Sequence, residues 1–216
     1  MSKEKRLLFF LSIFVASAFS PKAYPLTVED LMGQLNNKYS SFEDVRMEFT
    51  QSISSDVFES KSHFQGQIYI KNPDKFRIET LQQTIVANGE YIWVYSEENK
   101  QVTKNRYDPS SGILLPYRYL NSFKDDYKAK LDKEELIKKR WCYKLVLTPK
   151  DENSFVTKMI IWVDKETLLT LKLEYWDLND NEVTFLFKNI RIDSKIDDSE
   201  FVFKIPPGIE LLDLSE

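Results

Sequence analysis

Apolar and polar side chains alternate with a period of two along most of the chain beyond residue 44. Phe64, Ile68 and Ile70 are separated by polar side chains, and the alternation resumes at Phe76 after an Asn-Pro-Asp turn. This pattern predicts strands with one apolar face and one polar face. The predicted strands are residues 45–50, 64–71, 75–79, 84–87, 91–96, 100–104, 141–148, 155–163, 168–176 and 182–190.

Short polar connections join these predicted strands. One of them contains Asn88-Gly89, a pair that favours the tight turn of a hairpin. Strands that follow one another through short turns form an antiparallel meander. We therefore expect strands that are neighbours in the sequence to be neighbours in the sheet.

Residues 27–39 have helical periodicity instead. Their apolar side chains recur at intervals of three and four residues, which places them on one stripe of a helix. Thr27 stands at the N-cap position, and Asp30 stands three residues later, at the second position of a capping box. The apolar stripe consists of Val28, Leu31, Met32, Leu35 and Tyr39.

Two segments interrupt the alternation. Residues 108–123 hold an apolar cluster between turn residues, and we expect a short helix there, near Pro116. Residues 124–140 are heavily charged, and we expect a strand to about Leu131 followed by a surface turn or short helix.

The predicted strands all present an apolar face, and two helices of about a dozen residues cannot cover so wide a sheet. The sheet must therefore either pack against a second sheet or curl upon itself. If it curls with the helices across its mouth, a hydrophobic hollow results. Either way, the fold class is mainly β.

Residues 1–18 are typical of a secretory signal peptide. A basic start at residues 3–6 is followed by an apolar run at 7–15 and by the small-residue cleavage site Ala16-Ser17-Ala18. We expect cleavage after Ala18 and one mature domain of residues 19–216. A permanent membrane anchor is the alternative, although the apolar run is short for a bilayer.

Charge and cysteine content narrow the function classes. The chain has 30 basic and 34 acidic side chains, and loss of residues 1–18 removes three basic and one acidic, which leaves a net charge of −6. Such an acidic protein is a poor general binder of nucleic acid or anionic membranes. Because Cys142 is the only cysteine, no disulfide can form within the chain, and stability must come from the core.

The sequence contains no motif for catalysis or phosphate binding. Cys142 and His63 are formally available as a nucleophile pair, but no Asp or Asn stands where it would orient the histidine. Residues 177–182 offer oxygen ligands at alternating positions, yet the sixth is Glu182 where a calcium loop needs glycine, so we expect a polar hairpin turn. We therefore expect no catalysis, cofactor or metal.

Five segments follow one another in an order and spacing that resemble one known family. They are SFEDVRMEFTQ at 41–51, GQIYIKNPDKFRIE at 66–79, ANGEYIWVY at 87–95, LVLTPK at 145–150 and FVFKIPPGIELLD at 201–213. The chain from about residue 27 to 213 resembles the LolA family, periplasmic carriers that take lipoproteins from the inner to the outer membrane. No single segment decides the resemblance, which depends on all five together.

The resemblance implies an unclosed antiparallel β-barrel covered by short helices, with a hydrophobic cavity that receives acyl chains of lipoproteins. It also implies a monomeric carrier, loaded by an inner-membrane ABC-type lipoprotein-releasing complex and unloaded by an outer-membrane lipoprotein receptor. A related periplasmic module that binds lipids or senses lipoproteins is the alternative, and an exported hydrolase is a third hypothesis.

One position departs from the family pattern. Well-known members have an arginine before the proline of the K-x-P turn, where it helps to hold the lid closed, and this chain has Asn72. An asparagine can still donate a hydrogen bond to a lid carbonyl, but it has no charge and a shorter reach.

Strand parity and the resemblance together give the expected site. The expected cavity residues are Phe49, Ile68, Ile70, Phe76, Ile78, Leu171, Leu173, Phe185 and Phe187. The expected lid residues are Ile113, Leu114 and Leu115, with Asn72 as the candidate lid contact.

Overall fold

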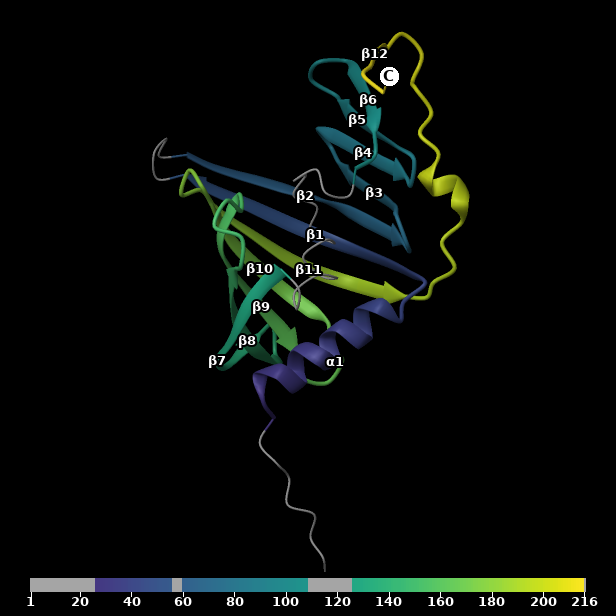
Figure 1. Ribbon diagram of the computed structural model, residues 1–216. Coiled ribbons are helices and arrows are strands. Elements are labelled where there is room, and N and C mark those ends of the chain that lie inside the picture. The colour runs from purple at the N-terminus through teal and green to yellow at the C-terminus, as the bar shows by residue number, and fades with distance from the viewer. Residues whose placement is uncertain (1–25, 56–59, 109–125, 216) are drawn as a thin grey trace, which may run out of the picture.

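The computed structural model describes residues 26–55, 60–108 and 126–215, and these residues form one curled sheet with helix α1 against it (Figure 1). The helical elements are α1 (Val28–Ser40) and the short 3-10 helix η1 (Asp198–Phe201). The strands are β1 (Asp44–Ser55), β2 (Ser60–Lys71), β3 (Lys75–Thr80), β4 (Gln83–Asn88), β5 (Tyr91–Ser96), β6 (Gln101–Arg106), β7 (Tyr127–Ile137), β8 (Arg140–Pro149), β9 (Val156–Asp164), β10 (Thr170–Asp177), β11 (Glu182–Ile192) and β12 (Glu210–Asp213).

All twelve strands belong to the same sheet, in the order β12-β6-β5-β4-β3-β2-β1-β11-β10-β9-β8-β7. Most neighbours are consecutive in the sequence and antiparallel, as the short connections predict. The end strands β12 and β7 do not pair with each other, so the barrel is unclosed. Of the two ways to cover the apolar face, the described residues therefore show the curled sheet and not a second sheet.

Helix α1 begins as the sequence predicts. The Thr27 hydroxyl accepts a hydrogen bond from the Asp30 amide at 3.1 Å, and the Asp30 carboxylate accepts one from the Thr27 amide at 3.4 Å, which completes the capping box. The helix buries Leu31, Leu35 and Tyr39 against the sheet, which confirms the apolar stripe. None of the helices in the described ranges combines the length and the hydropathy that crossing a membrane requires.

The prediction for residues 124–140 is wrong in its second half. Strand β7 continues to Ile137, and the following turn is made by Lys138 and Lys139, which both have positive φ. The charged composition of this segment suggests a surface turn. The segment nevertheless stays extended, because it pairs with β8 on both sides of an irregularity between Leu131 and Glu134. Such charges are common on the outermost strand of a sheet, because they discourage pairing with other chains.

Residues 193–209 form a segment that we call the C-terminal strap. It leaves the end of β11, runs along the outside of the β3–β6 region and leads into β12, which pairs parallel with β6 (Figure 1). Buried Asp44 holds its start, because its carboxylate accepts hydrogen bonds from the Ser194 amide at 2.8 Å and the Ile196 amide at 3.0 Å. Burial alone would raise the pKa of Asp44, but these hydrogen bonds outweigh it and hold the pKa below its usual value.

The middle of the strap is tied to the adjacent strands. The Asp198 carboxylate forms ion pairs with Lys71 at 2.6 Å and with Lys75 at 3.1 Å. Farther along, the rings of Phe203 and Trp93 stack, with 6.3 Å between centroids. The short helix predicted near Pro116 and the signal peptide both lie outside the described residues.

Candidate functional site

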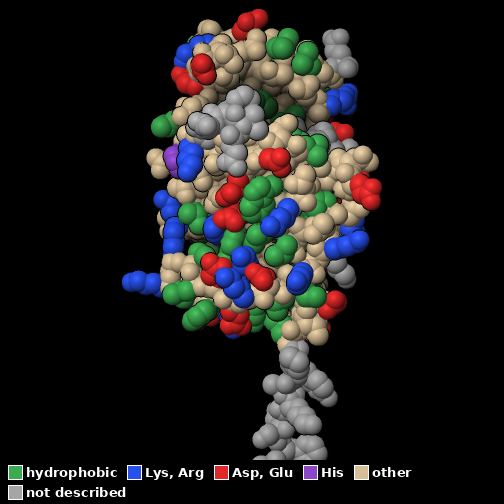
Figure 2. Space-filling view, turned by 90° about the vertical axis from the view of Figure 1, so that its left-hand side faces the viewer, with side chains coloured by type: hydrophobic (Ala, Val, Ile, Leu, Met, Phe, Trp, Pro, Cys, Tyr) green, Lys and Arg blue, Asp and Glu red, His purple; other side chains and the backbone are tan. Residues whose placement is uncertain are grey.

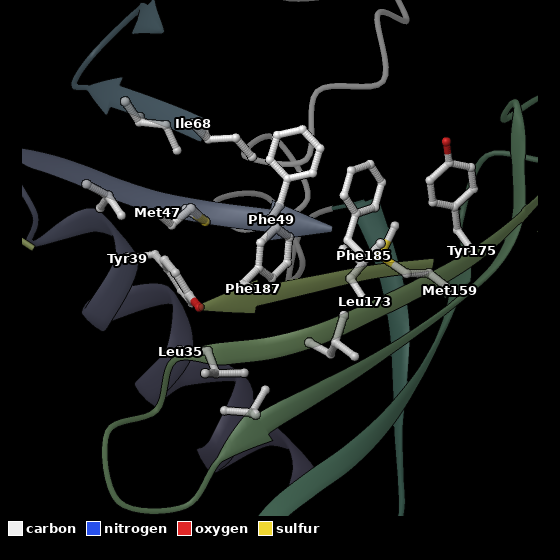
Figure 3. Packing of buried hydrophobic residues seen from close by; sticks show 14 of the residues in the cluster. Leu35, Tyr39, Met47, Phe49, Ile68, Met159, Leu173, Tyr175, Phe185 and Phe187 are labelled. Atoms are coloured by element: carbon white, nitrogen blue, oxygen red, sulfur yellow. The ribbon is translucent and has the colours of Figure 1, made fainter. Parts of the chain in front are cut away.

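One face of the sheet carries a continuous cluster of buried apolar side chains, and we call it the inner face. Helix α1 lies against this face, and side chains from α1, β1, β2 and β9–β11 project into the same space (Figure 3). The cluster extends across the sheet from Ile92 on β5 to Tyr127 on β7. It therefore spans most of the width of the sheet.

Aromatic rings occupy the centre of the inner face. Phe49 on β1 lies 5.7 Å from Phe185 on β11, and Phe185 stacks on Phe187 at 6.0 Å between centroids. Gly66 on β2 is paired with Phe49, and a Cβ at this position would collide with the backbone oxygen of Glu79 and lie 2.9 Å from the Phe49 ring. The ring of Phe49 therefore occupies a place that only a glycine leaves open.

The structure brings together all but one of the expected cavity residues. Phe49, Ile68, Ile70, Phe76, Ile78, Leu173, Phe185 and Phe187 belong to the inner-face cluster. Leu171 is the exception, since it packs with Cys142, Ile160 and Trp162 in a separate cluster on the opposite, outer face. The register of β9 against β10 shifts between Thr170 and Lys172, and this irregularity breaks the parity by which Leu171 was placed.

Sequence reasoning missed the contribution of β8 and β9. Leu145 and Leu147 on β8, and Met159 and Ile161 on β9, are fully buried members of the inner-face cluster. The alternation of β8 was a usable signal for the first pair. In β9 the run Met159–Val163 is buried on both faces, so no alternation marks its inner side.

The side chains of the inner-face cluster are buried, with at most 9% of each exposed. A space-filling view shows a recess near the top of the molecule, with hydrophobic side chains visible inside it (Figure 2). The expected lid residues Ile113, Leu114 and Leu115 lie outside the described residues, so their role stays a prediction.

The α1 end of the inner face is fixed by buried polar contacts. The Tyr39 hydroxyl donates a hydrogen bond to the Thr170 hydroxyl at 3.0 Å and accepts one from the Thr170 amide at 2.8 Å. Burial raises the pKa of Tyr39, so the phenol stays protonated and able to donate. These two hydrogen bonds join helix α1 to the start of β10, which lies on the opposite side of the inner-face cluster from β2.

Asn72 lies where α1 meets the sheet. Its side-chain amide donates to the Phe42 carbonyl oxygen at 2.6 Å, and its backbone amide donates to the Glu43 carbonyl oxygen at 3.0 Å. A surface pocket of about 600 Å³ adjoins these residues and is lined by residues 40–43 and 71–73. The described contacts of Asn72 thus hold the end of the helix, and its contact with the expected lid is a prediction.

The Asp177 carboxylate stabilises a turn. The buried Asp177 carboxylate accepts from the Asn179 amide at 2.8 Å and the Asn181 amide at 3.0 Å, which closes the β10–β11 hairpin. The described residues contain no group of three or more His, Cys, Asp or Glu that could hold a metal ion. Segment 177–182 is therefore a hairpin turn, as expected.

Cys142 and His63 are not brought together. Cys142 is buried on β8, and burial raises the pKa of its thiol to about 11, which disfavours the reactive thiolate. His63 is exposed on β2, and strands β1, β11, β10 and β9 lie between the two. The hypothesis of a Cys–His nucleophile pair has no geometric support.

Comparisons with known proteins agree with this architecture. Residues 40–204 match the model of a family described as outer membrane lipoprotein carrier protein LolA. An outer-membrane lipoprotein carrier protein of Hahella chejuensis is 25% identical over 213 residues, with 96% of this chain and 98% of that protein covered.

Two further comparisons extend beyond the named carriers. An uncharacterized protein of Methanocaldococcus jannaschii is 24% identical over 216 residues, and the match spans 96% of this chain but only 60% of that protein. The crystal structure of an uncharacterized conserved protein from Thermus thermophilus superimposes with a TM-score of 0.54 at 10% identity, covering 86% of this chain and 98% of that chain. The likeness to the Thermus protein is one of fold alone.

Proposed function

Because the chain belongs to the LolA family of outer membrane lipoprotein carrier proteins, we propose that it is a periplasmic carrier. In this role, it binds the acyl chains of lipoproteins on its inner face and delivers them to the outer membrane. The observation that carries this proposal is the inner-face cluster, a set of apolar side chains that continues across the curled sheet from β5 to β7. Catalysis by a small set of polar groups does not require an extended apolar surface. Binding of a flexible hydrocarbon chain does require one.

The energetics suit transfer without a reaction. Burial of an acyl chain of about a dozen methylene groups is worth about 10 kcal/mol relative to water, at about 0.8 kcal/mol for each group. Relative to a bilayer the gain is close to nothing, because both surroundings are apolar. The direction of transfer is then set by the partners, an inner-membrane ABC-type releasing complex as donor and an outer-membrane receptor as acceptor.

Specific residues are proposed for each part of this function. Phe49, Phe185 and Phe187 form the centre of the acyl site, and Ile68 and Leu173 flank it on β2 and β10. Residues 113–115 are proposed to cover the site as a lid, with Asn72 as the contact that controls it. The Asn72 amide is held at the α1–β1 junction, so lid control through this position would act on the end of the helix.

A release assay tests the proposal. Purified mature protein is incubated with spheroplasts, and newly made lipoproteins are sought in a soluble one-to-one complex with it. We expect such a complex, and we expect Leu114→Glu to weaken its formation while leaving the circular dichroism spectrum unchanged. Leu178→Glu, a change at a leucine that is 60% exposed in the β10–β11 turn, is the matched control.

Other outcomes separate the competing functions. Binding of free fatty acid or phospholipid without release of lipoproteins would favour a lipid-binding module of the same fold. Ester hydrolysis that Cys142→Ala abolishes would support the hydrolase hypothesis instead. Unchanged lipoprotein release by Leu114→Glu would contradict the lid assignment alone.

A further inference from the structure

Strand β2 has a free edge beside the acyl site. Along its whole length β2 pairs with β1, but β3 pairs only with Gly66–Lys71. Among the residues that the structure describes, no strand pairs with Ser60–Gln65 on the side away from β1. The main-chain groups on that side of these residues are therefore available to a further strand.

A groove runs along this free edge. Its volume is about 350 Å³, and it is lined by Thr50, Gln51, His63, Phe64, Gln65, Leu81 and Gln82. Lys61, Ser62, His63 and Gln65 are exposed, so the edge is open to solvent. Leu81 stands at the tip of the β3–β4 turn with 81% of its surface exposed, although it is a large apolar side chain.

The free part of β2 and the end strand β7 differ in their protection. The outer edge of the sheet, β7, carries charged side chains along most of its length and an irregularity after Leu131, and both features discourage strand addition. The free part of β2 has the sequence SKSHFQ, with one lysine as its only full charge. This part of β2 is therefore better suited than β7 to accept a strand.

The groove lies close to the proposed acyl site. Gln51 lines the groove and pairs with Phe64 on β2, and on its other side it pairs with Phe185, at the centre of the inner face. The free edge thus lies two strands from Phe185, or about 10 Å at the usual spacing of strands. When the acyl chains of a lipoprotein lie on Phe185, the amino acid residues that follow its acylated residue lie at the free edge of β2.

We propose that the free edge of β2, residues 60–65, binds the extended peptide segment that follows the acylated residue of a lipoprotein, by strand addition. This inference rests on the proposed carrier function. Strand addition uses main-chain hydrogen bonds, which are the same for every sequence. A carrier that serves lipoproteins with unrelated sequences can therefore hold all of them in this way, with Leu81 in contact with one side chain of the added strand.

Synthetic lipopeptides test the proposal on the mature chain. The first probe is a diacylated cysteine followed by five residues of Ser and Thr, the second has N-methyl groups at alternate residues of the same segment, and the third is the diacylated cysteine amide alone. We expect N-methylation to weaken binding of the lipopeptide about tenfold, the effect of losing one or two main-chain hydrogen bonds. Amide hydrogen exchange at residues 61–65 should slow with the first probe and not with the third.

A pair of variants sharpens the test. Leu81→Glu should weaken the first probe several-fold and leave the third unchanged, whereas the control Leu178→Glu should change neither. Equal binding of the first and second probes, or no protection of residues 61–65, would overturn strand addition while the carrier function stands. If none of the probes binds, both the carrier function and this inference fail.

Discussion

The outer face of the sheet is covered in two different ways. Over β3–β6, which we call the strap half, the cover is the C-terminal strap, and Val86 and Val102 beside it are fully buried although they do not belong to the inner-face cluster. Over β8–β11, which we call the lysine half, the cover consists of side chains from the strands themselves. The same sheet thus uses a distant chain segment at one end and local side chains at the other.

The lysine half shows how local cover works. Trp162 is only 3% exposed, and the ammonium groups of Lys172 and Lys144 lie 4.2 Å and 5.5 Å from its ring centroid. The Trp162 indole also donates to the Glu135 carboxylate at 3.2 Å. Lysine stems are apolar and their heads stay in water, so several of them can shield a ring with no backbone above it.

The difference between the halves concerns cooperativity. The strap is anchored at few points, so the loss of one anchor should expose a whole stretch of the strap half. In the lysine half each side chain covers its own neighbour, so the loss of one should have a small and local effect. Three substitutions test this comparison, from the largest expected effect to the smallest.

Removal of the buried strap anchor should have the largest effect. Phe201 is 1% exposed in η1, and Phe201→Ala should lower the free energy of unfolding by about 3–5 kcal/mol, as is usual for a buried phenylalanine. Urea denaturation followed by fluorescence measures this change. Val202→Ala, at a neighbouring side chain that is 55% exposed, is the control, and an equal loss in both variants would refute the anchoring role.

The carboxylate at the start of the strap should have an intermediate effect. Asp44→Asn replaces the acceptor of the Ser194 and Ile196 amides by a group that also donates, and we expect a loss of about 1–3 kcal/mol at pH 7. Asp180→Asn, at an exposed turn position, should leave stability nearly unchanged.

The effect of Asp44 should also depend on pH. Burial opposes the charged form, but the hydrogen bonds outweigh it, so the folded pKa lies below the unfolded value of about 3.9. A lowered pKa contributes stability that is complete above the unfolded pKa and is lost as the pH falls through the folded pKa. The difference in unfolding free energy between the wild type and Asp44→Asn should therefore shrink below about pH 4; a constant difference down to pH 2 would contradict this account.

A change in the lysine half should have the smallest effect. Lys158→Met on β9 keeps the apolar stem over Trp176, whose ring centroid lies 4.7 Å from the Lys158 ammonium group, and removes the charge, so we expect a loss of only about 0.5–1 kcal/mol. Thermal unfolding with tryptophan fluorescence measures the change, and Lys128→Met at an exposed position on β7 is the control. A loss as large as that of Phe201→Ala would show that the two halves do not differ as described.

The parts of the fold that were predictable are those whose signal is local. The capping box at Thr27 and Asp30 and the alternation around Phe49, Phe76 and Phe185 depend only on neighbouring residues, and the structure confirms the helix and the shared face. Leu171 was misplaced because the irregularity that turns it outward depends on how β10 pairs with β9. Such a register shift has no signature within one strand.

Edges and long connections were not predictable for a related reason. A charged strand such as β7 resembles a loop in composition, and only its pairing with β8 keeps it extended. The parallel pairing of β12 with β6 joins residues more than a hundred positions apart, and no periodicity encodes it. The free edge of β2 is likewise a consequence of where β3 ends, so it is visible only in three dimensions.

The missing hydrogen bonds between β7 and β12 have a mechanical consequence. In a closed barrel the number of strands and their stagger fix the circumference, so a bulkier guest can enter only if strands part. Here the end strands β12 and β7 are unpaired with each other, so the curvature of the sheet can change through small changes of twist between neighbouring strands while their hydrogen bonds stay intact. In the proposed carrier role, such a sheet can accommodate ligands with different numbers of acyl chains without separation of paired strands.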